Sequence, residues 1–155
     1  MSPATVAAVC LGSPYRGDDA AGSLVAERLR QAGAPLLDCD DEPTRLLDAW
    51  AGLDLVVVVD AVRSGAEAGT LHRVEAVEGK LPRDLGLAST HAFGIAEALE
   101  LGRALGRAPR HVVVHGVEGE RFVMGEPPSP AVVEAVGSLA EAVLAELEGT
   151  CTRRP

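Results

Sequence analysis

Apolar and polar residues alternate along the chain in blocks that predict strands and helices in turn. Short apolar runs, typical of strands buried in a parallel sheet, are separated by stretches in which apolar residues recur every three or four positions, as on one face of a helix. Strands are predicted at 6–10, 36–39, 55–60, 70–75 and 111–117, and helices at 21–32, 44–51, 93–105 and 131–147. This order predicts an α/β fold, a single doubly wound three-layer domain with a mostly parallel five-stranded sheet.

Two of the predicted strands differ in their surroundings. Leu55–Asp60 begins with five consecutive apolar residues, four of them Val, so we expect it to be buried on both faces, with Asp60 where the strand ends. Thr70–Glu75 alternates polar and apolar residues, which indicates an edge strand with one wet face that can run antiparallel. Ser89 or Thr90 is predicted to cap the helix that follows them.

The composition is that of a soluble globular protein. The 155 residues fit one domain, 1–155, in which 149–155 is expected to be a frayed tail. Hydrophobic residues make up 47% and charged residues 24%, so the chain can build a sizeable core. The formal net charge of -9 argues against nucleic acid and anionic lipid as partners, because both require a basic face.

The chain shows no targeting or membrane signal. Its first residues lack the basic region, long apolar core and cleavage site of a signal peptide, and the longest apolar run, Val6–Leu11, is too short to cross a bilayer. Cys10, Cys39 and Cys151 are odd in number and lack C-x-x-C spacing, which predicts neither a disulfide framework nor a zinc site. We therefore expect a cytoplasmic protein whose cysteines are small hydrophobic residues.

Candidate chemistry gathers at the expected carboxyl edge of the sheet, where ligands bind in open α/β folds. Asp18 and Asp19 lie in a glycine-containing loop after the first strand, Asp60 ends the Val-rich strand, and His91 stands where a loop enters a helix. Carboxylates with one imidazole suit nickel, zinc or iron, and they equally suit acid–base chemistry. Spacing alone does not choose between these roles, because only the fold can bring the residues together.

Several motifs run in order over nearly the whole chain. They are Gly12-Ser13-Pro14, Gly17-Asp18-Asp19, Gly22, Val59-Asp60-Ala61, Ser89-Thr90-His91, Gly116-Val117-Glu118 and Ser129-Pro130-Ala131-Val132. In this order they resemble those of the hydrogenase maturation endopeptidases, which remove a C-terminal extension from the large subunit of nickel–iron hydrogenases. The chain departs from the family pattern at Ser13, where Asn is frequent, at Ala20, where Gly is frequent, and at Gly119, where Pro is common.

The resemblance implies that Asp19, Asp60 and His91 are the catalytic, metal-contacting trio. In the family the metal is nickel already seated in the substrate precursor, rather than a cofactor held tightly by the peptidase. Asp18 is interpreted as a helix cap or a support for its neighbour. His115 is expected to form a structural hydrogen bond, and His72 and His111 to be ordinary surface or strand-end residues.

The implied partner is a hydrogenase large-subunit precursor, with no nucleic acid and no membrane, and a monomer is favoured. Peptide hydrolysis through a metal-polarised carbonyl or an activated water stays open. A second hypothesis is a non-catalytic metal-sensing chaperone that binds the same precursor without cutting it. A peptidyl-tRNA hydrolase is disfavoured because a tRNA partner requires a basic face.

Overall fold

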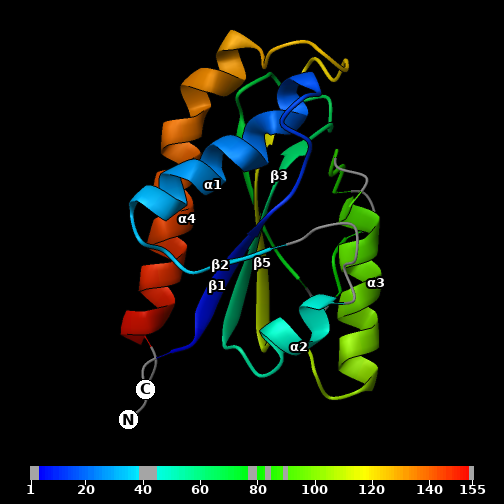
Figure 1. Ribbon diagram of the computed structural model, residues 1–155, viewed down its shortest axis with the longest axis vertical. Coiled ribbons are helices and arrows are strands. Elements are labelled where there is room, and N and C mark those ends of the chain that lie inside the picture. Colours follow the sequence, from blue (N-terminus) through cyan, green and yellow to red (C-terminus); the bar gives the residue numbers. More distant parts are fainter. Residues whose placement is uncertain (1–3, 39–44, 77–79, 83–84, 89–90, 154–155) are drawn as a thin grey trace.

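Five strands form one sheet in the order β2-β1-β3-β5-β4, in a computed structural model that describes residues 4–38, 45–76, 80–82, 85–88 and 91–153 (Figure 1). The strands are β1 (Val6–Cys10), β2 (Leu36–Leu37), β3 (Leu55–Val62), β4 (Leu71–Glu75) and β5 (His111–Glu118). The helices are α1 (Ala21–Gln31), α2 (Leu46–Trp50), α3 (His91–Ala104) and α4 (Pro130–Arg153), with a 3-10 turn, η1 (Gly17–Ala20), before α1. All neighbouring strands are parallel except β4, which pairs antiparallel with β5.

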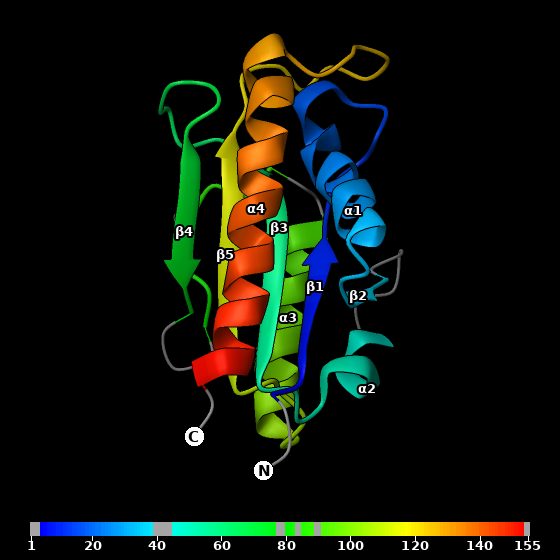
Figure 2. The same cartoon turned by 90° about the vertical axis from the view of Figure 1, so that its left-hand side faces the viewer.

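The helices cover both faces of the sheet. Helices α1 and α4 pack together on one face, while α2 and α3 lie on the other (Figures 1 and 2). Each face has its own apolar core, because alternate residues of the central strands point to opposite sides. Val57 and Val59 of β3 contribute to the core under α1 and α4, and Val56 and Val58 to the core under α2 and α3. The predicted three-layer α/β fold is confirmed.

Most predicted elements are found, and their ends differ for identifiable reasons. β4 is the antiparallel edge strand that its alternating pattern favours, with a burial pattern that also alternates. β2 is shorter than predicted, and Cys39 lies outside the described residues, as do Ser89 and Thr90. α4 continues to Arg153, beyond the predicted end at residue 147. Within the described residues, no helix is both long and apolar enough to span a membrane.

A polar network fastens α4 to the edge of the sheet. His115 lies inside β5 and is buried, and its Nε2 is 2.9 Å from Oε1 of Glu146 on α4. Arg73 of β4 donates to the same carboxylate through Nε at 2.6 Å, and to Glu75 through Nη2 at 2.8 Å. These hydrogen bonds, the one from Arg73 above all, hold the pKa of Glu146 below its ordinary value although burial opposes them. The predicted hydrogen-bonded role of His115 is thus confirmed.

Candidate functional site

The site lies where β1 and β3 end side by side. β1 connects onward to β2 on one side of it, whereas β3 and β5 lie on the other, so this is the topological switch point of the sheet. Leu11 extends the pairing beyond β1, since its N–H donates to the carbonyl of Val59 at 2.8 Å. The chain then forms η1, which contacts β3. Sequence order and sheet order together thus place the acidic loop at this edge.

Two glycines allow the loop to fold tightly against the strand. Gly12 has φ +110, and a Cβ there would lie 2.1 Å from the carbonyl oxygen of Asp19 and 3.0 Å from its Oδ1. Gly22, in the first turn of α1, approaches so closely that a Cβ would lie 1.9 Å from the carbonyl oxygen of Leu11. A side chain at either position would displace Asp19 or the start of α1.

Asp19 is held by one carboxylate oxygen, and its other oxygen has no hydrogen-bond partner among the described residues. The residue is 3% exposed. Oδ2 accepts hydrogen bonds from the Ser13 N–H at 3.0 Å and from Arg16 Nη1 at 3.3 Å. Oδ1 is buried and receives no hydrogen bond from any described residue. Because an unpaired buried carboxylate oxygen is costly, Oδ1 is a candidate position for a further hydrogen-bond or metal contact.

Asp60 lies inside β3 and not at its end, so the predicted boundary was wrong. Ala61 and Val62 still pair with β5, and the Ala88 N–H donates to the Ala61 carbonyl at 2.9 Å, which adds backbone bonds that the sequence pattern did not show. Asp60 is fully buried, and its Oδ1 accepts the N–H of Ala61 at 2.9 Å. Its partner across the ladder is Gly116 of β5.

His91 is the first residue of α3, and its side chain lies outside the part of the chain that the structure describes. Asp19 and Asp60 both lie at the carboxyl edge, as predicted. Among the described residues, no three His, Cys, Asp or Glu side chains form a group that can hold a metal ion. The trio of Asp19, Asp60 and His91 therefore remains a prediction.

Asp18 does not cap a helix; it fastens two distant loops together. Neither η1 nor α1 has a side-chain cap. Instead the fully buried carboxylate accepts N–H groups from Glu120 at 2.8 Å, Arg121 at 3.0 Å and Ser129 at 2.6 Å, and the Ser129 hydroxyl at 3.0 Å. Burial raises the pKa of Asp18, but these hydrogen bonds outweigh it and bring the pKa below its ordinary value. Asp18 thus supports its neighbour by fixing the loop around η1.

A stack of two arginines on one ring completes the wall of the site. The Arg16 guanidinium lies 5.7 Å from the ring centre of Phe122, and the Arg63 guanidinium lies 4.1 Å from it. Arg16 Nε also donates to the Phe122 carbonyl at 3.1 Å. Arg63 follows β3, so the stack joins the loops after β1, β3 and β5.

Glu118 anchors the loop that follows β3. It is 2% exposed and accepts the hydroxyl and N–H of Ser64, the latter at 2.9 Å, and the N–H of Gly65 at 3.2 Å. His72, which was predicted to be a surface or strand-end residue, is the second residue of β4, and its Nε2 lies 3.1 Å from the same carboxylate. Burial raises the pKa of Glu118, yet these hydrogen bonds bring it below its ordinary value. Sequence reasoning missed Glu118 as an anchor because its partners lie about fifty residues away.

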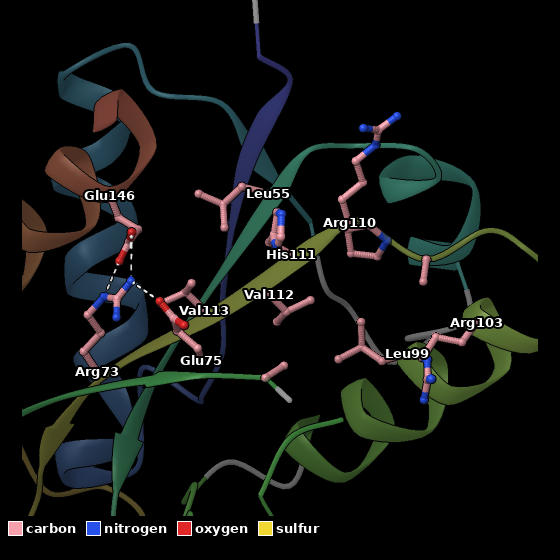
Figure 3. Close-up of a pocket in the computed structure, with 13 residues that line it drawn as sticks. Leu55, Arg73, Glu75, Leu99, Arg103, Arg110, His111, Val112, Val113 and Glu146 are labelled. Atoms are coloured by element: carbon pink, nitrogen blue, oxygen red, sulfur yellow. Dashed lines mark hydrogen bonds and ion pairs between the residues drawn. The ribbon is translucent and has the colours of Figure 1, made fainter. Parts of the chain in front are cut away.

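A cavity of about 790 Å³ lies at the opposite, amino-terminal end of β3 and β5 (Figure 3). Its apolar lining includes Leu55, Val112 and Val113, and its charged lining includes the Arg73–Glu146 pair described above. Figure 3 shows Arg73 bonded to both Glu146 and Glu75 on one side of this cavity, with Arg103 on the other. The cavity contains neither Asp19 nor Asp60 and is separate from the candidate site.

Comparisons with known proteins agree on one family. The family model described as hydrogenase maturation protease matches residues 23–146, a stretch that includes Asp60 and His91 and begins after Asp19. The hydrogenase expression/formation protein HupD of Thiocapsa roseopersicina is 33% identical over 115 residues, 70% of this chain and 51% of that protein. Its namesake from Bradyrhizobium diazoefficiens is 31% identical over 125 residues, 77% of this chain and 64% of that protein. The chain thus spans between half and two thirds of the length of these relatives.

Solved structures share the fold. The hydrogenase maturating endopeptidase HybD from Escherichia coli has a TM-score of 0.80 at 24% identity, covering 94% of this chain and 93% of that one. The [NiFe] hydrogenase maturation protease HybD from Thermococcus kodakarensis has a TM-score of 0.76 at 22% identity, covering 92% and 99%. At these identities the likeness concerns the arrangement of strands and helices.

Proposed function

The chain belongs to the hydrogenase maturation protease family, and on that premise we propose that it is an endopeptidase acting on a nickel–iron hydrogenase large-subunit precursor. It removes the C-terminal extension of the precursor and recognises nickel that is already seated in this substrate. We propose further that it acts in the cytoplasm, as a monomer, and that it holds no nickel tightly when free.

The observation that supports this proposal most directly is the uneven use of the Asp19 carboxylate. Oδ2 is occupied by Ser13 and Arg16, whereas Oδ1 is buried and lacks a hydrogen bond from the described residues. A carboxylate arranged in this way can offer one oxygen to a metal ion without giving up its own support. Nickel accepts oxygen and imidazole ligands, which fits a set made of Asp19, Asp60 and His91.

The site can use such a contact to position the peptide. A nickel ion bound in the precursor keeps its own ligands, so the peptidase has only to supply the remaining ones. Binding of the ion by Asp19 and Asp60 would fix the distance between the site and the nearby scissile bond. The scissile peptide would then be held in one orientation at the site instead of reaching it by random collision. A precursor that lacks nickel would lose this alignment and stay uncut.

The experiment is incubation with a nickel-loaded large-subunit precursor, followed by mass spectrometry of the substrate. The wild-type chain should release a C-terminal peptide, and nickel-free precursor should remain intact. Asp19→Asn, Asp60→Asn and His91→Gln should each stop the release. Asp48→Asn is the matched control, because Asp48 is an exposed acid on α2, with a side chain 81% exposed.

Two outcomes would contradict the proposal in different ways. If a variant that carries all three substitutions processes the precursor at the normal rate, the trio has been assigned wrongly. If the wild-type chain forms a stable complex with the precursor and releases no peptide, the protein is a metal-sensing chaperone and not a peptidase.

A further inference from the structure

The orientation of the Asp19 carboxylate depends on a residue that the trio does not include. Rotation about the Cβ–Cγ bond of Asp19 would turn the plane of its carboxylate, so the donors on one oxygen determine where the other oxygen points. Two donors act on Oδ2, the Ser13 N–H at 3.0 Å and Arg16 Nη1 at 3.3 Å. Gly12 lies against the other side, where a Cβ would come within 3.0 Å of Oδ1. Of the two donors only Arg16 carries a charge and can be changed without altering the backbone.

Arg16 is itself held in place at three points. Its Nε donates to the Phe122 carbonyl, its Nη1 contacts Asp19, and its guanidinium lies over the Phe122 ring. The side chain is 25% exposed, which is low for an arginine at a loop. Arg63 lies over the same ring at 4.1 Å, so Phe122 is fixed in turn. A guanidinium is planar and donates from several nitrogens in a rigid arrangement, which lets one side chain make these contacts together.

We propose that Arg16 is a positioning residue for the peptidase reaction: it occupies Oδ2 of Asp19 and so keeps Oδ1 directed at the nickel-bearing precursor. This inference rests on the proposed function for the identity of the incoming group. Arg16 touches neither the substrate nor the metal. It acts through Asp19, and Phe122 keeps Arg16 at the required place.

The chemistry of this arrangement separates arginine from lysine. An ammonium group at position 16 could reach Asp19 or the Phe122 carbonyl, but it lacks the fork that serves both. Charge alone would therefore restore only part of the function. Replacing a residue that hydrogen-bonds to a metal ligand typically lowers metal affinity or activity by about 10- to 100-fold.

The experiment measures cleavage of nickel-loaded precursor at saturating enzyme by Arg16→Met, Arg16→Lys and the control Arg30→Met. Met keeps much of the apolar stem and loses the donors. Arg30 is a surface arginine on α1 whose side chain is 60% exposed and pairs only with Glu27, at 3.6 Å, among the described residues. We expect a rate 10- to 100-fold lower for Arg16→Met, an intermediate rate for Arg16→Lys, and the wild-type rate for Arg30→Met. Denaturant unfolding of each variant shows whether it is folded under the assay conditions.

Each result decides the matter. A folded Arg16→Met variant that cleaves within two-fold of Arg30→Met overturns the proposal, and so does full rescue by Arg16→Lys, which would reduce the role of Arg16 to its charge. If the wild-type chain and Arg30→Met both fail to cleave, the proposed function fails, and a crystal structure of Arg16→Met still tests the positioning. We then expect a turned Asp19 carboxylate, whereas an unchanged carboxylate with Oδ1 still unpaired contradicts the inference.

Discussion

Replacing Asp18 by Asn tests how the site is built, because it removes a charge and changes hardly any volume. The carboxylate accepts the N–H groups of Glu120 and Arg121 at one oxygen and that of Ser129 at the other. An amide has only one acceptor oxygen, so its NH₂ group must face an N–H donor on one side. The orientation of the Asn amide that loses the fewest hydrogen bonds keeps the N–H groups of Glu120 and Arg121 bonded and leaves the Ser129 N–H without an acceptor.

The magnitude follows from these contacts. A buried N–H that loses its acceptor costs about 1–3 kcal/mol, and each hydrogen bond that remains loses about 1 kcal/mol when its acceptor becomes neutral. Asp18 is fully buried, so solvent does not screen the loss. We therefore expect Asp18→Asn to lower the free energy of unfolding by about 3–5 kcal/mol, a large share of the 5–15 kcal/mol typical of a domain.

The assay is denaturant unfolding followed by the fluorescence of Trp50, the single tryptophan, which is fully buried in α2. Asp48→Asn again serves as the control: it removes an exposed acid that pairs with Arg107, and should change stability by less than about 0.5 kcal/mol. A loss below about 1 kcal/mol for Asp18→Asn would show that Asp18 does not fasten the loop.

The same variant has a defined dependence on pH. The pKa of Asp18 is lower in the folded chain than its ordinary value of 3.8, so its contribution to stability is fully present above that value and is lost as pH falls through the folded pKa. The difference in stability between wild type and Asp18→Asn should thus be full at pH 7 and shrink below pH 3.8. A difference that grows on acidification would contradict this sign.

Two further predictions concern packing and the α4 network. Gly22→Ala should destabilise the protein by about 1–3 kcal/mol despite the better helix propensity of Ala, because its Cβ would meet the Leu11 carbonyl oxygen. Gly137→Ala in α4, where the nearest atom is 3.7 Å away, should instead stabilise it by about 0.5–1 kcal/mol. Equal shifts in thermal midpoint for both variants would refute the close approach at Gly22. Glu146→Gln should destabilise by about 1 kcal/mol at pH 7, since Arg73 is half exposed and screened. Because the folded pKa of Glu146 is lowered, this difference should be full above pH 4.5 and shrink as pH falls below it, which acid titration of both proteins by circular dichroism checks.

The fold could be predicted from the sequence because its strongest signals are local. The Val run that begins at Leu55 and the helical spacing of α1 each report burial within a few residues of chain. Boundaries were less predictable where tertiary contacts decide them. β3 extends to Val62 because β5 and the segment around Ala88 supply further backbone partners, and no local pattern encodes those.

The edge of the sheet at which Asp19 and Asp60 lie was predictable from the sequence, whereas the contacts that hold these side chains were not. Parallel strands present their carboxyl ends at one edge, which is enough to place Asp19 and Asp60 there. The supports of Asp19 were not foreseen, since Arg16 depends on Phe122, 106 residues later. Asp18 was expected to be a helix cap or a support for its neighbour, and the donors that decide between these roles lie more than 100 residues away. Residue type indicates which groups can bond, whereas only the fold decides which ones meet.

The two margins of the sheet have a consequence for self-association. An open sheet can grow by pairing its outermost strand with a strand from another molecule, and this is a common route to aggregation. Here one margin is β2, which is only two residues long. The other is β4, where Arg73 and Glu75 are already tied to each other and Arg73 also to Glu146. The short length of β2 and the paired charges on β4 both disfavour the addition of a strand from another molecule, so neither margin invites growth of the sheet.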